Sequence, residues 1–159
     1  FVLTPQSSFA LSNVRKLSFY HTHTGEKLAI DYFDGEQYIP DALDEIDHYL
    51  KDFRTGEVHT IDAKLLDVLH QLQVAVDKPG TFEIISGYRS PKTNAKLRNK
   101  SKGVAKRSLH MQGKAMDIRL AGFDTGKLNK AARSLARGGV GYYPKSNFIH
   151  VDTGRVRTW

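Results

Sequence analysis

The chain has 159 residues, enough for one ordinary domain with its own core and too few for two. Hydrophobic residues make up 40% of it and charged residues 26%, which excludes global disorder, and no apolar run reaches the roughly 18 residues needed to span a bilayer. Cysteine is absent, which excludes disulfides and thiolate ligands, and the formal net charge of +7 favours a polyanionic partner.

The first predicted element is a loosely attached arm over residues 1–15, and one domain follows over residues 16–159. Two strand-like runs, 17–20 and 27–33, flank the turn signal Thr24-Gly25-Glu26. This pattern predicts a β-hairpin at the start of the domain.

Helical spacing of apolar residues next predicts a helix over 41–54 and a second helix from Asp62 to about residue 78. A short strand is expected over 82–85. Ser90 and Pro91 are typical of an N-cap and a first helical position, so a third helix should run from there to Lys100.

The segment 101–107 is basic and contains glycine, which favours an exposed loop. A strand over 114–120 and a helix over 125–137 are predicted next, followed by paired strands over 140–143 and 147–151. Helices early in the chain and strands clustered late indicate a single α+β domain built on an antiparallel sheet.

The residues that carry chemistry are His110, Asp117 and His150. Two imidazoles and a carboxylate form the ligand set that holds a catalytic Zn²⁺ and leaves one position open for water. Gly113 lies between the first two and would let the backbone reverse. Taken singly, each of these residues is more simply explained as structural, and Asp152 could be only a hydrogen-bond partner of His150.

Four segments strengthen the case when they are taken together: Ser86-Gly-Tyr-Arg-Ser90, Ser108-x-His-x-x-Gly-x-Ala-x-Asp117, Gly138-Gly-Val-Gly-Tyr-Tyr143 and Phe148-Ile-His-Val-Asp-Thr-Gly154. In order and spacing they resemble the zinc peptidases of the D-Ala-D-Ala carboxypeptidase group. That group shares its fold with the hedgehog signalling domain and the lysostaphin-type enzymes. The resemblance runs from about Leu17 to Trp159.

The resemblance implies that His110, Asp117 and His150 are zinc ligands and that a water occupies the fourth position. It places Arg89 at the mouth of the site. An arginine there can donate to a developing oxyanion or pair with a substrate carboxylate, and the plain alternative is a surface salt bridge.

The chain departs from the family at the general base. Relatives carry a His two residues before the last ligand or a Glu three before it, and here those positions hold Phe148 and Asn147. Asp152 is the nearest substitute, either as the base or as a residue that orients a ligand histidine. Tyr142 and Tyr143 could donate to an oxyanion, but tyrosines near a turn more often serve only in packing.

The resemblance implies a zinc-dependent metallopeptidase that cuts stem peptides or cross-links of murein, with an endopeptidase favoured over a carboxypeptidase. Basic residues gathered between Arg89 and Arg119 suit the carboxylates of such a substrate, although a solvated basic face explains them as well. The alternative is a catalytically silent zinc-containing module that binds the cell wall.

A nucleic-acid-binding domain is the weaker rival, because the basic run lacks interleaved aromatic residues, and we expect no nucleic-acid partner. The start of the chain carries no leader and resembles a mature form, so we expect an exported, periplasmic monomer. His21 and His23 are expected at the surface, away from the zinc site.

Overall fold

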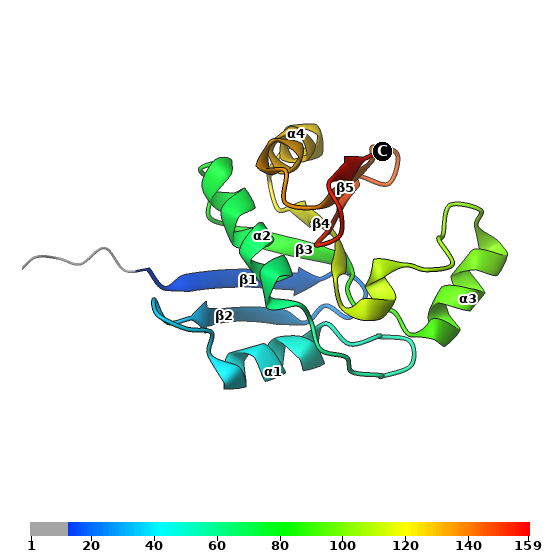
Figure 1. Cartoon of the computed structure of the whole chain (residues 1–159), viewed down its shortest axis with the longest axis horizontal. Helices are drawn as coiled ribbons and strands as arrows, with labels where there is room; N and C mark the ends of the chain where they lie inside the picture. The colour runs from blue at the N-terminus through cyan, green and yellow to red at the C-terminus, as the bar shows by residue number, and fades with distance from the viewer. Residues whose placement is uncertain (1–12) are drawn as a thin grey trace, which may run out of the picture.

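The structure is a computed structural model, and it describes residues 13–159. Within that range the chain forms one seven-stranded sheet, four α-helices and a 3-10 helix, η1 (Figure 1). In chain order the elements are β1 (Arg15–His21), β2 (Lys27–Phe33), α1 (Pro40–Tyr49), α2 (Ala63–Ala75), β3 (Thr81–Ser86), α3 (Pro91–Lys100), η1 (Leu109–Gln112), β4 (Ala115–Leu120), α4 (Thr125–Leu135), β5 (Gly139–Tyr143), β6 (Phe148–Asp152) and β7 (Arg157–Thr158). The arm expected over 1–15 lies outside the described residues as far as residue 12, and it stays a prediction.

The sheet is mixed, with the strand order β2-β1-β3-β4-β6-β5-β7. The pairs β1–β2, β3–β4, β4–β6 and β5–β6 are antiparallel, and the pairs β1–β3 and β5–β7 are parallel. The predicted α+β class is confirmed, and antiparallel pairing prevails. The sequence pattern does not predict the two parallel pairs, because each joins strands that are separated by a crossover connection.

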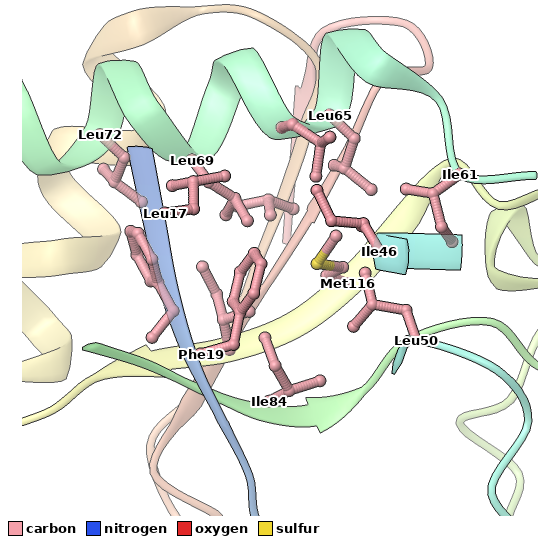
Figure 2. Close-up of a cluster of buried hydrophobic side chains, with 14 of the residues drawn as sticks. Leu17, Phe19, Ile46, Leu50, Ile61, Leu65, Leu69, Leu72, Ile84 and Met116 are labelled. Atoms are coloured by element: carbon pink, nitrogen blue, oxygen red, sulfur yellow. The ribbon is translucent and has the colours of Figure 1, made fainter. Parts of the chain in front are cut away.

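The core forms where α1, α2 and α4 pack with the sheet, and the leucines of α2 are its centre. These leucines follow helical spacing, so one face of α2 is apolar throughout. Figure 2 shows how the α2 leucines meet side chains from β1, β4 and α1: Leu17, Phe19, Ile46, Leu65, Leu69, Leu72 and Met116. Each fully buried side chain of this kind contributes about 1.5–3 kcal/mol to folding.

Helix boundaries follow local hydrogen bonding where the sequence pattern is ambiguous. Helix α1 ends at Tyr49 and not near residue 54, because the Asp52 carboxylate accepts hydrogen bonds from the backbone N–H of Arg54 (2.9 Å) and Thr55 (3.4 Å) and builds a turn. Gly56 completes that turn with a left-handed backbone, φ 78°. The turn therefore competes successfully with the helix, although the apolar spacing continues past Tyr49.

Helix α3 stands away from the body of the sheet (Figure 1) and is tied down by polar contacts. Ser90 caps it as predicted, accepting from Thr93 N at 3.2 Å, and Ser90 N donates to the Asp52 carboxylate at 2.9 Å. Burial raises the pKa of Asp52, but hydrogen bonds from Thr93, Ser90 and the backbone outweigh it and lower the pKa to about 2. The exposed basic residues of α3 and the following loop are Lys92, Lys96, Arg98, Lys100, Lys102, Lys106 and Arg107.

The prediction for the first two histidines is half wrong. His23 is exposed and stacks on Phe53 with ring centroids 4.4 Å apart, but His21 is buried and packs edge-on against the same ring. His21 ends β1, and its side chain shares the inward face of that strand with Phe19. Among residues 13–159, no helix combines the length and the apolar character that crossing a membrane requires.

The register of the central strands brings the residues of the functional site together. Ser86 on β3 pairs with Asp117 on β4, Asp117 pairs with His150 on β6, and His150 pairs with Gly141 on β5. Residues that lie directly opposite each other in a sheet point to the same face. The sheet therefore sets Asp117 and His150 side by side, although they are far apart in the sequence.

Candidate metal centre

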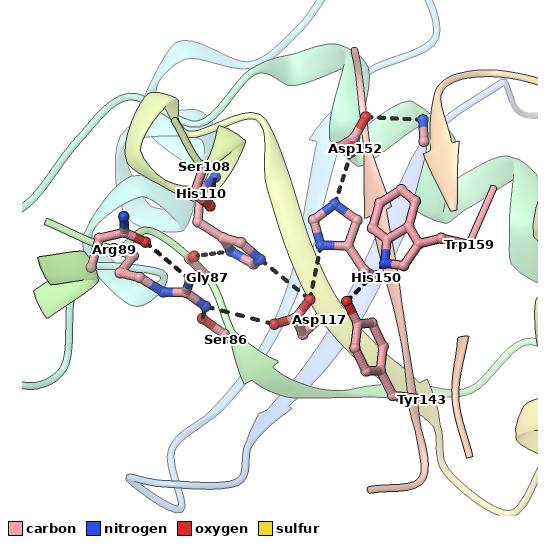
Figure 3. A network of polar contacts seen from close by, with 12 residues as sticks. Ser86, Gly87, Arg89, Ser108, His110, Asp117, Tyr143, His150, Asp152 and Trp159 are labelled. Atoms are coloured by element: carbon pink, nitrogen blue, oxygen red, sulfur yellow. Dashed lines mark hydrogen bonds and ion pairs between the residues drawn. The ribbon is translucent and has the colours of Figure 1, made fainter. Parts of the chain in front are cut away.

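Three of the predicted site residues meet at one point in the structure. His110 comes from η1, Asp117 from β4 and His150 from β6, and one potential ligand atom from each lies within 4.8 Å of the other two (Figure 3). His110 Nε2 is 3.2 Å and His150 Nδ1 is 3.0 Å from Asp117 Oδ1. All three residues are buried, so the fold holds these side chains firmly.

Gly113 places His110 over the sheet. It follows η1 with a left-handed backbone, φ 66°, so that Lys114 N can donate to Leu109 O at 3.1 Å and the chain can enter β4. A side chain at Gly113 would overlap the carbonyl oxygen of Thr60, which packs directly against the turn. The turn expected between His110 and Asp117 is therefore present, and only glycine fits there.

The second nitrogen of each histidine is already committed. His110 Nδ1 donates to the carbonyl oxygen of Gly87 at 2.9 Å, because a carbonyl can only accept. His150 Nε2 donates to Asp152 Oδ2 at 2.8 Å. Each hydrogen bond selects one tautomer, so His110 Nε2 and His150 Nδ1 carry lone pairs where they face Asp117.

When both imidazoles are neutral, three lone-pair atoms therefore converge with no hydrogen between them. Such a set requires a shared proton or a cation, and two imidazoles with one carboxylate match the ligands of catalytic zinc sites. Burial would raise the pKa of Asp117, but the charges of His110 and His150 and their hydrogen bonds outweigh it and hold the pKa well below its usual range. Burial would lower the pKa of His150, but hydrogen bonds to Asp117 and Asp152 raise it, so that without a metal ion a proton on His150 takes the place between Nδ1 and Asp117. The donor chemistry of the residues therefore fits a divalent metal ion.

Asp152 is fully occupied by hydrogen bonds that hold His150 in place. Its carboxylate accepts from the backbone of Gly139 and Gly154, both at 2.9 Å, from His150 Nε2 and from Arg157 Nη1 and Nη2 at 3.1 and 2.8 Å. Burial would raise the pKa of Asp152, but these hydrogen bonds keep it well below its usual range. Of the two roles that the sequence leaves open, this environment favours orientation of His150 over proton acceptance.

The glycines of the 138–143 segment make room for the last strand. A side chain at Gly139 would overlap Arg157 and Asp152, and the Cβ of a residue at position 141 would lie 2.5 Å from the Trp159 indole. Strand β7 pairs in parallel with β5 and lays Arg157 over Gly139, and Trp159 follows over Gly141. The glycine pattern is thus explained by two side chains, neither of which the sequence analysis singles out.

Arg89 lies beside the three convergent residues, deeper than the mouth of the site where the resemblance placed it. Its backbone N donates to His110 O at 3.1 Å, and Nη2 is 3.9 Å from Asp117 Oδ2. The guanidinium makes only long hydrogen bonds, to Asn94 Oδ1 (3.3 Å) and Ser86 Oγ (3.4 Å), and its Nε is buried without a partner. Burial lowers the pKa of Arg89 and the Asp117 carboxylate opposes that effect, so a weakly satisfied cation faces the site.

A cleft of about 410 Å³ opens above these residues. Its floor is formed by Arg89, His110, Asp117 and His150. One wall is the loop between α3 and η1, which includes Ser101, Gly103, Val104, Ala105, Arg107, Ser108 and Leu109. The other wall holds Tyr143, Phe148, Arg157 and Trp159.

The cleft holds no additional acidic residue or histidine among the described residues that line it. Phe148 stacks on Tyr143 with centroids 4.7 Å apart, and the Asn147 side chain turns away to accept from Thr125 Oγ1 at 2.6 Å. Neither Phe148 nor Asn147 can therefore act as a general base. No sequence motif identifies Arg157 and Trp159, and only the alternation of Gly139 and Gly141 indicates that side chains cross this strand.

Comparison with known proteins agrees with this architecture. The family model described as "Peptidoglycan L,D-endopeptidase MepK" matches residues 9–159. The peptidoglycan L,D-endopeptidase MepK of Escherichia coli K12 is 42% identical over 160 residues, which cover 99% of this chain and 88% of that protein. The probable peptidoglycan L,D-endopeptidase MepK of Haemophilus influenzae is 43% identical over 161 residues, covering 99% and 87%. No solved structure matches the chain significantly.

Proposed function

The chain belongs to the peptidoglycan L,D-endopeptidase MepK family, and we propose that it hydrolyses peptide cross-links of peptidoglycan with a Zn²⁺ ion held by His110, Asp117 and His150. The observation that carries the proposal is the convergence of three lone-pair atoms at the floor of a cleft, with the other nitrogen of each histidine already bonded. Such an arrangement fits a metallopeptidase of this family, and the cleft would give a substrate access to an ion held there.

Zinc is the ion that suits this ligand set best. Imidazole and carboxylate ligands are typical of catalytic zinc sites, and sites for Mg²⁺ or Ca²⁺ use oxygen ligands instead. When bound, Zn²⁺ supplies Lewis acidity that polarises the scissile carbonyl and makes water a stronger acid.

The protein residues position the groups that react. Gly87 and Asp152 fix the two histidine rings through the hydrogen bonds to His110 Nδ1 and His150 Nε2. Arg157 holds Asp152 in turn, so the orientation of His150 depends on a residue from the last strand.

Arg89 is proposed as the residue that meets the negative charge of the substrate. Hydrolysis adds the oxygen of water to the carbonyl carbon, breaks the C–N bond and leaves a proton on the departing amine. The carbonyl oxygen becomes negative on the way, and a guanidinium beside it lowers the energy of that state. Because Arg89 makes only long hydrogen bonds at present, it can take a substrate oxygen without breaking a strong contact.

The basic wall of the cleft agrees with a peptide that carries free carboxylates. Arg107 lines the cleft, and the other cations of α3 and its loop extend the positive surface outward. This charge would raise the local concentration of an anionic substrate. Since peptidoglycan lies outside the cytoplasm, we propose that the protein acts in the periplasm. We further propose that it is a monomer and that nucleic acid is not a partner.

Digestion of defined substrates tests the function directly. Two synthetic cross-linked peptides would be compared, one whose scissile amide joins an L to a D centre and one whose amide joins two D centres. We expect cleavage of the first, loss of activity with a chelator and recovery with one equivalent of Zn²⁺. If zinc-loaded protein leaves both peptides and purified sacculi intact, the proposed activity is wrong.

A binding module that keeps the metal without hydrolysis is the second candidate. The cleft favours it in one respect, because among the described lining residues no histidine or carboxylate is left over to act as a base. Sedimentation of the protein with sacculi, without release of muropeptides, would identify this function. Metal analysis should find about one zinc per chain, and none in a His110→Ala variant.

A further inference from the structure

Strand β5 presents two adjacent tyrosines to opposite faces of the sheet. Tyr142 packs against the hydrophobic core, and Tyr143 lines the cleft with its ring stacked on Phe148. Alternation along a strand requires this difference, so the two hydroxyl groups have unlike surroundings. Only Tyr143 can reach a bound substrate.

The Tyr143 hydroxyl is oriented by Trp159. The indole Nε1–H donates to the phenolic oxygen at 2.8 Å, as Figure 3 shows. Trp159 is itself fixed, since its backbone N donates to Val140 O at 3.2 Å and its backbone O accepts from Tyr142 N at 3.0 Å. Its ring lies over Gly141, which has no side chain to displace it.

The phenolic hydrogen is left without a protein acceptor among residues 13–159. A phenolic oxygen that accepts one hydrogen bond directs its own O–H to another side. Arg89 and Tyr143 lie on opposite sides of Asp117 (Figure 3), and both line the cleft. Two donors therefore flank the floor of the cleft.

We propose that Tyr143 is a catalytic residue that donates its phenolic hydrogen to the oxygen of the scissile carbonyl, from the side opposite Arg89, and that Trp159 positions it. The inference rests on the proposed peptidase function and adds a second donor to the site. Donors that are already aligned with a developing oxyanion stabilise it without reorganisation. The phenol keeps its proton throughout, so no proton acceptor is needed at this position.

The first test compares Tyr143→Phe with Tyr142→Phe as the matched control. Removing one oxyanion donor lowers kcat by about 10²-fold, and KM should stay within about threefold because the hydrogen bond is strongest in the transition state. Tyr142→Phe, which loses a hydroxyl from the same strand on the core side, should keep its kcat. Equal kcat values for wild type and zinc-loaded Tyr143→Phe would overturn the proposal.

Trp159→Phe tests the positioning role. It keeps a ring over Gly141 and removes only the N–H donor, so kcat should fall about 3–10-fold with KM unchanged, the effect of one lost hydrogen bond. Trp159 is the one tryptophan of the chain, so the single indole N–H resonance also reports this bond and should shift in Tyr143→Phe. An unmoved resonance, or a Trp159→Phe variant with the kcat of wild type, would contradict the positioning role.

A binding probe separates this proposal from the proposed function. A phosphinic pseudopeptide with the tetrahedral –PO₂–CH₂– group in place of the scissile amide mimics the charge of the intermediate. Tyr143→Phe should bind it about 10²-fold more weakly than wild type, whereas Tyr142→Phe should bind it equally. If this difference appears without cleavage of peptidoglycan, only the proposed function is wrong. If wild type does not bind the probe, or binds it no better than Tyr143→Phe, the role of Tyr143 is wrong.

Discussion

Asp152→Asn distinguishes a residue that holds a metal ligand from one that only holds the fold. Oδ1 accepts from Gly139 N, Gly154 N and Arg157 Nη1, and Oδ2 accepts from His150 Nε2 and Arg157 Nη2. An amide has the same size but one acceptor oxygen. Its NH₂ group takes the place of Oδ2, because there it meets two donors, whereas in the place of Oδ1 it would meet three.

The consequence reaches the proposed metal ligand. With an amide NH₂ facing it, His150 Nε2 has to accept, so the imidazole proton moves to Nδ1, the atom that points at Asp117. A protonated Nδ1 cannot hold zinc, and we expect zinc affinity to fall about 10–100-fold. The hydrogen bond from Arg157 Nη2 to a charged acceptor is lost, which should lower the free energy of unfolding by about 1.5–3 kcal/mol.

Zinc affinity is measured by competition with a chromophoric chelator, and stability by urea denaturation followed through the fluorescence of Trp159. The matched control is Asp52→Asn, since Asp52 is equally buried and its carboxylate is also hydrogen-bonded, but it touches none of the proposed ligands. It should lose stability and keep its zinc affinity. An Asp152→Asn protein that binds zinc within about threefold of wild type would refute the tautomer argument.

Three further outcomes are expected. Gly141→Ala puts a methyl group 2.5 Å from the Trp159 indole and should cost about 1–3 kcal/mol in urea denaturation, whereas Gly80→Ala, with its nearest neighbour at 3.5 Å, should change stability by less than about 0.5 kcal/mol. Burial would raise the pKa of Asp52, but its hydrogen bonds lower that pKa to about 2 in the folded protein. The ionised carboxylate therefore stabilises the fold by about 2 kcal/mol above pH ~4, and this stabilisation is lost as the pH falls toward 2. The stability difference between wild type and Asp52→Asn should shrink over that range, and a constant difference would contradict the reasoning. Arg89→Lys removes the planar fork and should lower kcat/KM at least about tenfold with zinc content unchanged, and full activity would exclude Arg89 from the reaction.

The site combines rigid and adjustable parts for a physical reason. His110, Asp117 and His150 sit on a short helix and two central strands, and each histidine is locked by a second hydrogen bond. Arg89 has long contacts and an unpartnered Nε instead. Metal ligands need fixed geometry, whereas a group that receives substrate must exchange one partner for another.

The helix starts and one key turn of this protein can be predicted from its sequence, because the interactions that determine them are local. The start of α2 at Asp62 and of α3 at Ser90 depends on caps that act within one helical turn. The turn at Gly113 is set by a backbone conformation that glycine adopts readily. The proposed ligand residues could be named because their types and spacing match a known family. The sequence pattern by itself does not show that their side chains meet.

Tertiary structure alone decided what surrounds those ligands. Asp152 lies on the same strand face as His150, but its hydrogen bonds to Gly139 and Arg157, which argue against a base, depend on the pairing of β5 with β6 and β7. Trp159 comes beside Tyr143 only because β7 returns in parallel to β5. Pairing between distant strands depends on the packing of the whole core, and no local periodicity carries that information. The sequence therefore determined which residues can bind a metal, and the fold determined which residues orient those ligands.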